Sequence, residues 1–221
     1  MPDTPVQPAS SQALSSASPG VGGKGDDLGQ VPVQHFTQLR EEIIKDEPIF
    51  SGRIIDVHHY EIKTAAGKAA KREIVHHGGG VAIVALTEDQ EILLVSQFRL
   101  AANMVVLELP AGCLEPGEDP LQAAQRELAE ETGCHANSWC KLAEFFVSPG
   151  YTTEVIHLYL AEDLSFGQQN LDEDEFLNLS KMSMDQALQA CRDLEIKDAK
   201  TLSGILAAQD CLRRRKGGTG A

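Results

Sequence analysis

Residues 120–132 restrict the folds open to this chain more than any other segment, because the sequence specifies a helix there and also both of its ends. Asp119 can cap the first turn with its side chain, and Pro120 suits the first helical position, where a missing N–H costs nothing. Gly133 can adopt the left-handed conformation that ends many helices. We therefore predict a helix from Pro120 to about Thr132.

The predicted helix has two chemically different faces. Its apolar stripe, suited to packing on a sheet, comprises Leu121, Ala124 and Leu128. On another face Glu127 and Glu131 stack one turn apart, with Glu130 beside them. Carboxylates crowded in this way repel one another unless a cation neutralises them, and Mg²⁺ prefers such hard oxygen ligands. A solvated, Glu-rich surface is the alternative, and the helix taken alone favours it.

Short apolar runs elsewhere in the chain predict strands, with few helices between them. The expected strands span residues 49–61, 69–76, 81–86, 91–98, 104–109, 141–147, 155–161 and 175–179. Two further helices are expected, one from the capping residue Ser183 to about Leu194 and one over about 199–215. Strands interleaved with few helices indicate a mixed α/β layered domain.

The composition indicates where in the cell the chain is expected and which classes of partner it disfavours. Its 221 residues include 33 acidic and 19 basic side chains, and the formal net charge of −14 opposes nonspecific binding to nucleic acid or an anionic membrane. The longest unbroken apolar run, 81–86, is far below the ~20 residues of a membrane span. Five cysteines without a Cys-x-x-Cys pair favour a reducing cytoplasm over a disulfide framework or a zinc site.

The segment from Gly112 to Gly133 resembles the Nudix box at every defining position. It reads G-x5-E-x7-R-E-L-x-E-E-x-G. With seven fixed residues besides the apolar Leu128, at roughly 6% usage each, coincidence is expected about once in 10⁸ to 10⁹ windows. The resemblance implies an α/β/α sandwich with a mixed sheet. It also implies a bound divalent cation, Mg²⁺ or alternatively Mn²⁺, and hydrolysis of a diphosphate that is linked to a further group.

The same resemblance implies a role for each matching residue. The metal ligands would be the backbone carbonyl of Ala111 and the side chains of Glu127, Glu130 and Glu131, with Glu130 as a further ligand or a catalytic support. Arg126 would orient these carboxylates through salt bridges. Glu118 would serve Arg126 or the outer metal shell.

Segments that flank the box resemble the ADP-ribose (ADP-sugar) pyrophosphatase branch of the superfamily. Pro149 stands 16 residues beyond Gly133, which is the marker spacing of that branch, and the resemblance covers about residues 46–212. It implies substrate contacts by four residues, namely Arg72, Arg99, Glu108 and Pro149. For Arg99 and Glu108 an ordinary surface ion pair is the alternative. In the acidic loop over 172–176, Glu175 or Glu173 would accept a proton from the attacking water, and Glu175 is favoured.

Together these features predict Mg²⁺-dependent hydrolysis of ADP-ribose, or a related ADP-sugar, to AMP and a sugar phosphate. The alternative substrates are GDP-mannose, another nucleotide sugar and NADH. A non-catalytic module that senses a nucleotide is a different class, and it is disfavoured because every carboxylate of the box is present. Residues 108–131 hold seven acids and one base, and 144–175 hold eight acids and no base, so the negative charge is concentrated in two segments. Cations bound at these segments would let an anionic diphosphate approach.

The chain is expected to divide into four segments. Residues 1–35, rich in Pro, Ser, Ala and Gly, are expected to form a disordered tail, and 216–221 a short flexible one. Residues 36–78 are expected to form a small β-sheet that pairs two chains, as in related ADP-sugar pyrophosphatases. The hydrolase domain would then span 79–215, and the expected assembly is a homodimer.

Overall fold

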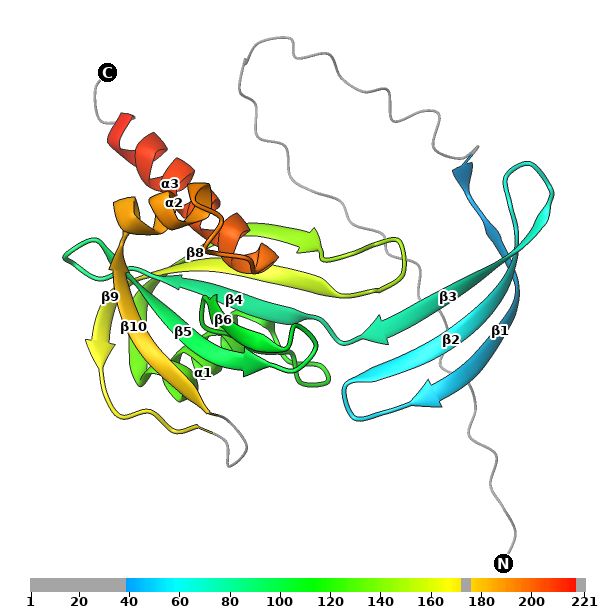
Figure 1. Cartoon of the computed structure of the whole chain (residues 1–221), viewed down its shortest axis with the longest axis horizontal. Helices are drawn as coiled ribbons and strands as arrows, with labels where there is room; N and C mark the ends of the chain where they lie inside the picture. The colour runs from blue at the N-terminus through cyan, green and yellow to red at the C-terminus, as the bar shows by residue number, and fades with distance from the viewer. Residues whose placement is uncertain (1–38, 172–175, 218–221) are drawn as a thin grey trace, which may run out of the picture. The chain divides into compact units, whose positions relative to one another are not determined.

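The computed structural model describes residues 39–171 and 176–217 (Figure 1). The strands that precede the first helix are β1 (Glu42–Ser51), β2 (Ile55–Lys63), β3 (Ala69–His77), β4 (Gly80–Ala85), β5 (Glu91–Arg99), β6 (Met104–Glu108) and β7 (Ala111–Cys113). They are followed by α1 (Pro120–Thr132), β8 (Cys134–Phe146), β9 (Val155–Phe166), β10 (Leu177–Ser183), α2 (Met184–Arg192) and α3 (Ala199–Gly217). All three predicted helices are confirmed, including the capping box of Ser183 at the start of α2.

The strands from β4 to β10 form two sheets. The first has the strand order β7-β4-β9-β8 and is mixed, because β4 and β9 run parallel while the other neighbours are antiparallel. The second has the order β10-β5-β6 and is antiparallel throughout. The mixed character expected of the sheet therefore comes from the single parallel pair of β4 and β9.

Strand β4 contributes side chains to two hydrophobic cores, which explains its unbroken apolar sequence. Ala82 and Val84 pack in the core that includes residues of α2 and α3, whereas Val81, Ile83 and Ala85 pack in the core that includes residues of α1. Successive strand residues point to opposite faces, so a strand covered by helices on both sides is apolar throughout. The layers are helix, sheet and helix, and the predicted α/β/α sandwich is confirmed.

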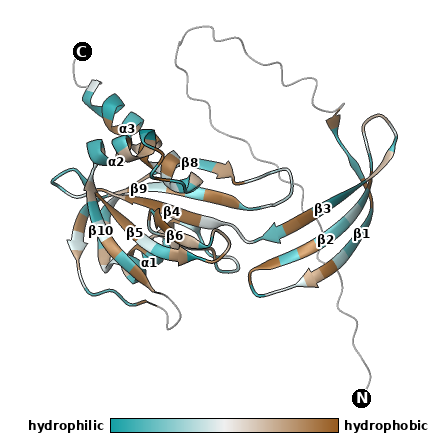
Figure 2. Ribbon diagram, viewed as in Figure 1, coloured by the Kyte–Doolittle hydropathy of each residue, from teal (hydrophilic) through white to brown (hydrophobic). Residues whose placement is uncertain are grey.

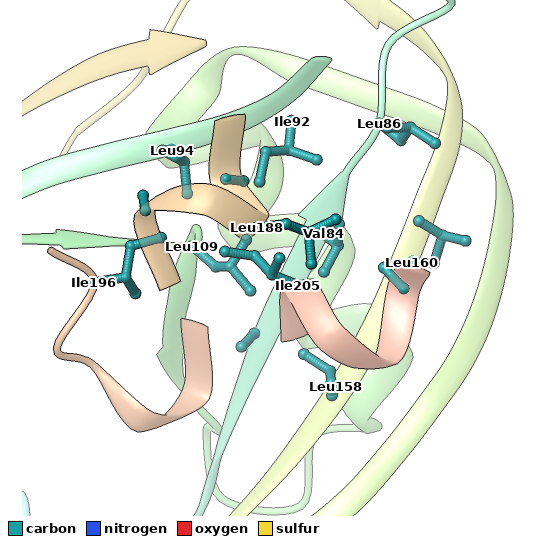
Figure 3. Packing of buried hydrophobic residues seen from close by; sticks show 14 of the residues in the cluster. Val84, Leu86, Ile92, Leu94, Leu109, Leu158, Leu160, Leu188, Ile196 and Ile205 are labelled. Atoms are coloured by element: carbon teal, nitrogen blue, oxygen red, sulfur yellow. The ribbon is translucent and has the colours of Figure 1, made fainter. Parts of the chain in front are cut away.

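Helix α3 lies close against the sheet because the residue at position 204 is glycine. A Cβ atom there would come nearer to Leu109 than the 3.0 Å that real Cβ atoms keep, and it would lie 3.2 Å from side-chain atoms of Leu158 and Val84. The neighbouring Ile205 is fully buried in the same cluster (Figure 3). The first half of α3 is thereby held beside Leu109, immediately after β6.

The single strand expected over residues 49–61 is wrong, because the chain turns at residues 52–54. There the N–H of Gly52 donates to the carbonyl of Ile55 (2.9 Å), and β1 and β2 on either side of the turn pair antiparallel. Every residue of β1 is exposed, so no buried face imposes the alternating pattern by which a strand is recognised. Strand β8 also begins earlier than expected, at Cys134, and the short β7 gives no sequence pattern of its own.

The N-terminal sheet, with the order β1-β2-β3, is joined by hydrogen bonds to the turn that contains Pro149. Val75 of β3 donates its N–H to the carbonyl of Tyr151 (2.7 Å) and accepts from the N–H of Thr153 (3.0 Å). Several large apolar side chains of β1 are exposed to solvent, namely those of Ile43, Ile44, Ile49 and Phe50. Figure 2 colours parts of β1 as hydrophobic. The role of this sheet in pairing two chains stays a prediction.

The expected tails fall almost entirely outside the described residues. Helix α3 includes residues 216 and 217 of the C-terminal tail, and the segment boundaries expected at 36 and 79 stay predictions. In the described ranges, no helix has both the length and the apolar character needed to span a membrane. The five cysteines are all free thiols.

Candidate active site

Helix α1 places the acidic side chains, and local hydrogen bonds fix both of its ends. The side chain of Asp119 accepts hydrogen bonds from the N–H groups of Leu121 (2.9 Å) and Gln122 (3.2 Å). At the other end Gly133 has φ of 69°, in the left-handed region, and donates its N–H to the carbonyl of Ala129. Both caps predicted from the sequence are therefore confirmed, and the rotation of the helix about its axis is fixed by its apolar stripe.

Arg126 is the centre of a carboxylate cluster on α1. Its guanidinium donates to both carboxylate oxygens of Glu118 (3.0 Å each), to Glu127 (2.8 Å) and to Glu130 (3.0 Å). The hydrogen bonds from Arg126 lower the pKa of Glu118 below its ordinary value, although partial burial opposes them. The arrangement holds three carboxylates in fixed orientations, and the orienting role of Arg126 in catalysis stays a prediction.

The carboxylate of Glu127 lies directly over the backbone of Gly112. A Cβ atom at position 112 would meet the Glu127 carboxylate carbon and both oxygens well inside the 3.0 Å that real Cβ atoms keep. The Glu127 side chain is 10% exposed, so this close approach also holds it away from bulk water. Glycine is required at position 112 because the carboxylate occupies the space of a side chain.

Glu131 is held on the same side of the helix by Ala111, the first residue of β7. Its side chain is almost fully buried, and Oε2 accepts a hydrogen bond from the N–H of Ala111 (2.9 Å). Ala111 in turn pairs with Ala82 in the register of β7 with β4. The structure therefore brings Ala111, Glu127 and Glu131 together, although they come from two different elements.

The chemistry of this cluster fits a hard divalent cation. Arg126 supplies one positive charge against four carboxylates, those of Glu118, Glu127, Glu130 and Glu131, and burial makes that excess negative charge costly. Oxygen donors of this kind suit Mg²⁺ or Mn²⁺. Within the described ranges, no three acidic, histidine or cysteine side chains already converge at metal-binding distance. Arg126 and the Ala111 N–H hold the carboxylates instead.

Arg99 and Glu108 form a bidentate ion pair beside this cluster. Nε of Arg99 donates to Oε1 of Glu108 (2.7 Å) and Nη2 donates to Oε2 (2.8 Å). The Glu108 side chain is only 2% exposed, whereas that of Arg99 is 43% exposed. The pair is therefore not an ordinary surface ion pair, since one partner is buried. Contact of Arg99 or Glu108 with substrate stays a prediction.

The structure adds a residue that the sequence did not indicate. Lys200, at the start of α3, also donates to Oε2 of Glu108 and lies 3.0 Å from Asp198. Burial by itself raises the pKa of Glu108, but the hydrogen bonds and charges of Arg99 and Lys200 outweigh it, and the pKa lies below its ordinary value. No local signal marks Lys200, because 92 residues separate it from Glu108.

The remaining predicted site residues lie in other parts of the structure. Arg72 of β3 forms its hydrogen bonds with Glu41 and with the backbone carbonyl of Lys71, within the N-terminal segment. Pro149 is exposed in a turn where Ser148 accepts from the N–H of Tyr151 (3.1 Å). Glu173 and Glu175, the two candidate proton acceptors, lie outside the described residues. The substrate and proton-transfer roles of these residues stay predictions.

The fold and the site define an α/β/α protein whose acidic helix is organised around one arginine. The model of the NUDIX domain matches residues 76–204, more than half of the chain. The chain is 42% identical to an ADP-ribose pyrophosphatase of Bacillus subtilis (strain 168) over 182 residues, which cover 80% of this chain and 98% of that protein. It belongs to the Nudix family, and the resemblance seen in the box is confirmed.

Two further comparisons agree with this assignment. The chain is also 42% identical to a methanol dehydrogenase activator of Bacillus methanolicus over 183 residues, which cover 80% of this chain and 98% of that protein. The solved structure titled "Crystal structure of ADP compounds hydrolase" superposes with a TM-score of 0.72 at 22% identity, covering 80% of this chain and 96% of that chain. At that identity the structural likeness shows the fold alone.

Proposed function

We propose that this protein hydrolyses the diphosphate of ADP-ribose, or of a related ADP-sugar, to AMP and a sugar phosphate with the help of Mg²⁺. The observation that carries the proposal is the cluster in which Arg126 and the Ala111 N–H hold Glu127, Glu130 and Glu131 in fixed orientations. The likeness to the Bacillus subtilis ADP-ribose pyrophosphatase supports the choice of substrate. Mn²⁺ is an alternative cation because its ligand preference is similar.

The protein's own groups have distinct tasks in this reaction. The carboxylates of Glu127, Glu130 and Glu131, with the carbonyl of Ala111, would hold the cations, which when bound neutralise the diphosphate and lower the pKa of attached water. Arg126 keeps the carboxylates of Glu127 and Glu130 aligned. Arg99, whose guanidinium is half-exposed, would bind a phosphate oxygen or the terminal ribose.

The proton of the attacking water must be taken up by a base. Glu175, or else Glu173, would accept it in the acidic loop over 172–176, and Glu175 is favoured. Separate Glu→Gln variants at the two positions distinguish them. The variant that removes the base should lower kcat and leave KM for ADP-ribose much less affected.

The proposed assembly is a homodimer formed through the N-terminal sheet. Four large apolar residues of β1 are exposed, and burying them between two chains would remove them from water. Arg72 and Pro149 would then contact substrate at or near the subunit interface. Sedimentation of the purified protein as a monomer at micromolar concentration would contradict the dimer.

A cytoplasmic location is proposed as well, supported by the odd number of cysteines and the lack of a Cys-x-x-Cys pair. The acidic balance of the chain supports a small-molecule substrate over nucleic acid or a membrane surface. A nucleoside-diphosphate sugar meets this condition because bound cations can offset its charge.

A substrate panel tests the proposed activity. ADP-ribose, GDP-mannose, NADH and nucleoside triphosphates are compared with Mg²⁺, with Mn²⁺ and with a chelator, and kcat/KM is measured for each. ADP-ribose should be cleaved fastest, and the chelator should abolish cleavage. If GDP-mannose or NADH is preferred, the substrate assignment is wrong while the hydrolase assignment stands.

One variant separates an enzyme from a nucleotide sensor. Glu131→Gln keeps the shape of a buried side chain but removes its charge, so turnover should fall below detection while the folded state persists in circular dichroism. A sensor would have no turnover in the wild-type protein, and its nucleotide affinity would be the property that changes.

A further inference from the structure

Glu108 is a buried carboxylate that two cations share. Arg99 reaches it from the end of β5 through Nε and Nη2, and Lys200 reaches it from the start of α3. Lys200 itself is only 17% exposed and lies 3.0 Å from Asp198. The four side chains therefore form a compact network of two cations and two anions next to the carboxylate cluster of α1.

The start of α3 is fixed in place by more than this ion pair. Oγ1 of Thr201 accepts a hydrogen bond from the N–H of Leu109 (2.8 Å) and donates one to Asp198 (2.6 Å). The N–H of Thr201 also donates to Asp198 (2.9 Å). Gly204 allows the helix to approach Leu109 closely. Lys200 is thus presented to Glu108 by a rigid element, with little entropy to lose on forming the contact.

The charge balance gives Lys200 a consequence for Arg99. Asp198 makes the network of four side chains neutral overall, but Lys200 donates to Oε2 of Glu108, the same oxygen that accepts from Nη2 of Arg99, so the two cations share one carboxylate. Because Lys200 takes part of the carboxylate's charge, Arg99 retains positive potential on its solvent side, where 43% of its side chain is exposed. In the described part of the chain, its third nitrogen, Nη1, has no hydrogen-bond acceptor.

We propose that Lys200 is a positioning residue for diphosphate hydrolysis, which acts through Glu108 to fix Arg99 and to leave its positive charge available to a phosphate group of the substrate. This rests on the proposed function only in that the substrate is a diphosphate. On this proposal Glu108 acts on the substrate through Arg99, and Lys200 does not touch the substrate.

Steady-state kinetics of Lys200→Met test the proposal, with the diphosphate substrate that the wild-type protein cleaves best. We expect KM to rise about tenfold, the effect of losing one charge-assisted interaction, while kcat changes much less. Lys141→Met is the matched control, because Lys141 pairs with the exposed Glu144 of the same strand and its removal should leave KM unchanged. An unchanged KM in Lys200→Met would overturn the proposal.

A second comparison separates an effect through Glu108 from direct contact with the substrate. In Glu108→Gln the shared carboxylate is gone, so adding Lys200→Met should change KM by less than about twofold, as expected for groups that act as one unit. A tenfold rise in that background would mean that Lys200 binds the substrate itself, and the proposal would be wrong. The double variant removes the buried charges of Glu108 and Lys200 together, so neither is left without its partner. The comparison of Glu108→Gln with the double variant therefore remains decisive even if Lys200→Met alone does not fold.

The two proposals fail in different ways. A wild-type protein that cleaves none of the diphosphates in the panel would refute the proposed function. A wild-type protein that cleaves one of them, with a KM that does not depend on Lys200, would refute only the role of Lys200.

Discussion

Replacing Gly112 by alanine should separate activity from stability, because it displaces one carboxylate and little else. The new Cβ atom would overlap the Glu127 carboxylate, which must move by about 1 Å to reach the 3.0 Å that real Cβ atoms keep. A misplacement of that size at a reacting centre costs about 10²-fold in rate. We therefore expect kcat/KM for ADP-ribose to fall about 100-fold.

The effect of Gly112→Ala on folding should be much smaller. The displaced atoms are the end of a flexible side chain, and Arg126 keeps its bonds to Glu118 and Glu130. Losing the hydrogen bond between Arg126 and Glu127 lowers the free energy of unfolding by about 1.5–3 kcal/mol. Replacing glycine by alanine raises it by about 0.4–1 kcal/mol, because alanine reduces the conformational entropy of the unfolded chain. The free energy of unfolding should fall by about 1–2 kcal/mol, which lowers Tm by roughly 2–8 °C.

The assay combines hydrolysis of ADP-ribose, measured with added Mg²⁺, with thermal unfolding of the same samples. Gly78→Ala is the matched control, because a Cβ atom there meets only one atom, the Leu114 carbonyl oxygen, at an ordinary 3.7 Å. The control should retain wild-type kcat/KM within about threefold. If Gly112→Ala is as active as the control, the position of Glu127 over Gly112 has no bearing on catalysis and the reasoning fails.

Two further predictions concern the contacts of α3. Gly204→Ala should lower the free energy of unfolding by about 1–3 kcal/mol, because its Cβ atom would overlap Leu109 in a packed core, and denaturant titration measures this; a stability equal to wild type would mean that α3 can move away freely. The second prediction concerns pH. The pKa of Glu108 in the folded protein lies below its ordinary 4.5, so ionised Glu108 stabilises the folded state at pH values above 4.5. This contribution is lost as the pH falls from about 4.5 through the lower pKa of the folded state. Wild-type protein should therefore lose more stability between pH 5 and 3 than Glu108→Gln, and parallel pH profiles of the two would contradict the assignment.

Much of the candidate site follows from short-range sequence patterns. Asp119 and Gly133 form their capping hydrogen bonds within four residues in the chain, and the bounds of α1 could therefore be predicted to the residue. Arg126, Glu127 and Glu130 are likewise neighbours on one helical face. The apolar run over residues 81–86 predicted a strand, and the structure shows that this strand is buried on both faces.

The errors fall where tertiary contacts decide the outcome. Strand β1 has no buried face, so its sequence lacks the alternation from which strands are predicted, and the turn at 52–54 went unrecognised for the same reason. The early start of β8, at Cys134, depends on its pairing with Phe166 of β9, which lies 32 positions further along the chain. The strand propensity of residues and the spacing of apolar residues carry no information about which distant strand is the partner.

The family, the acidic helix and the residues expected to hold a metal can all be predicted from the sequence, because these depend on residue types at fixed local spacings. Only the tertiary structure decided that Glu108 is buried rather than exposed, and that Lys200 shares it with Arg99. It also placed the Glu127 carboxylate in the space of a missing side chain at Gly112. The physical reason is the same in each case: burial and charge sharing are properties of groups brought together from distant parts of the chain.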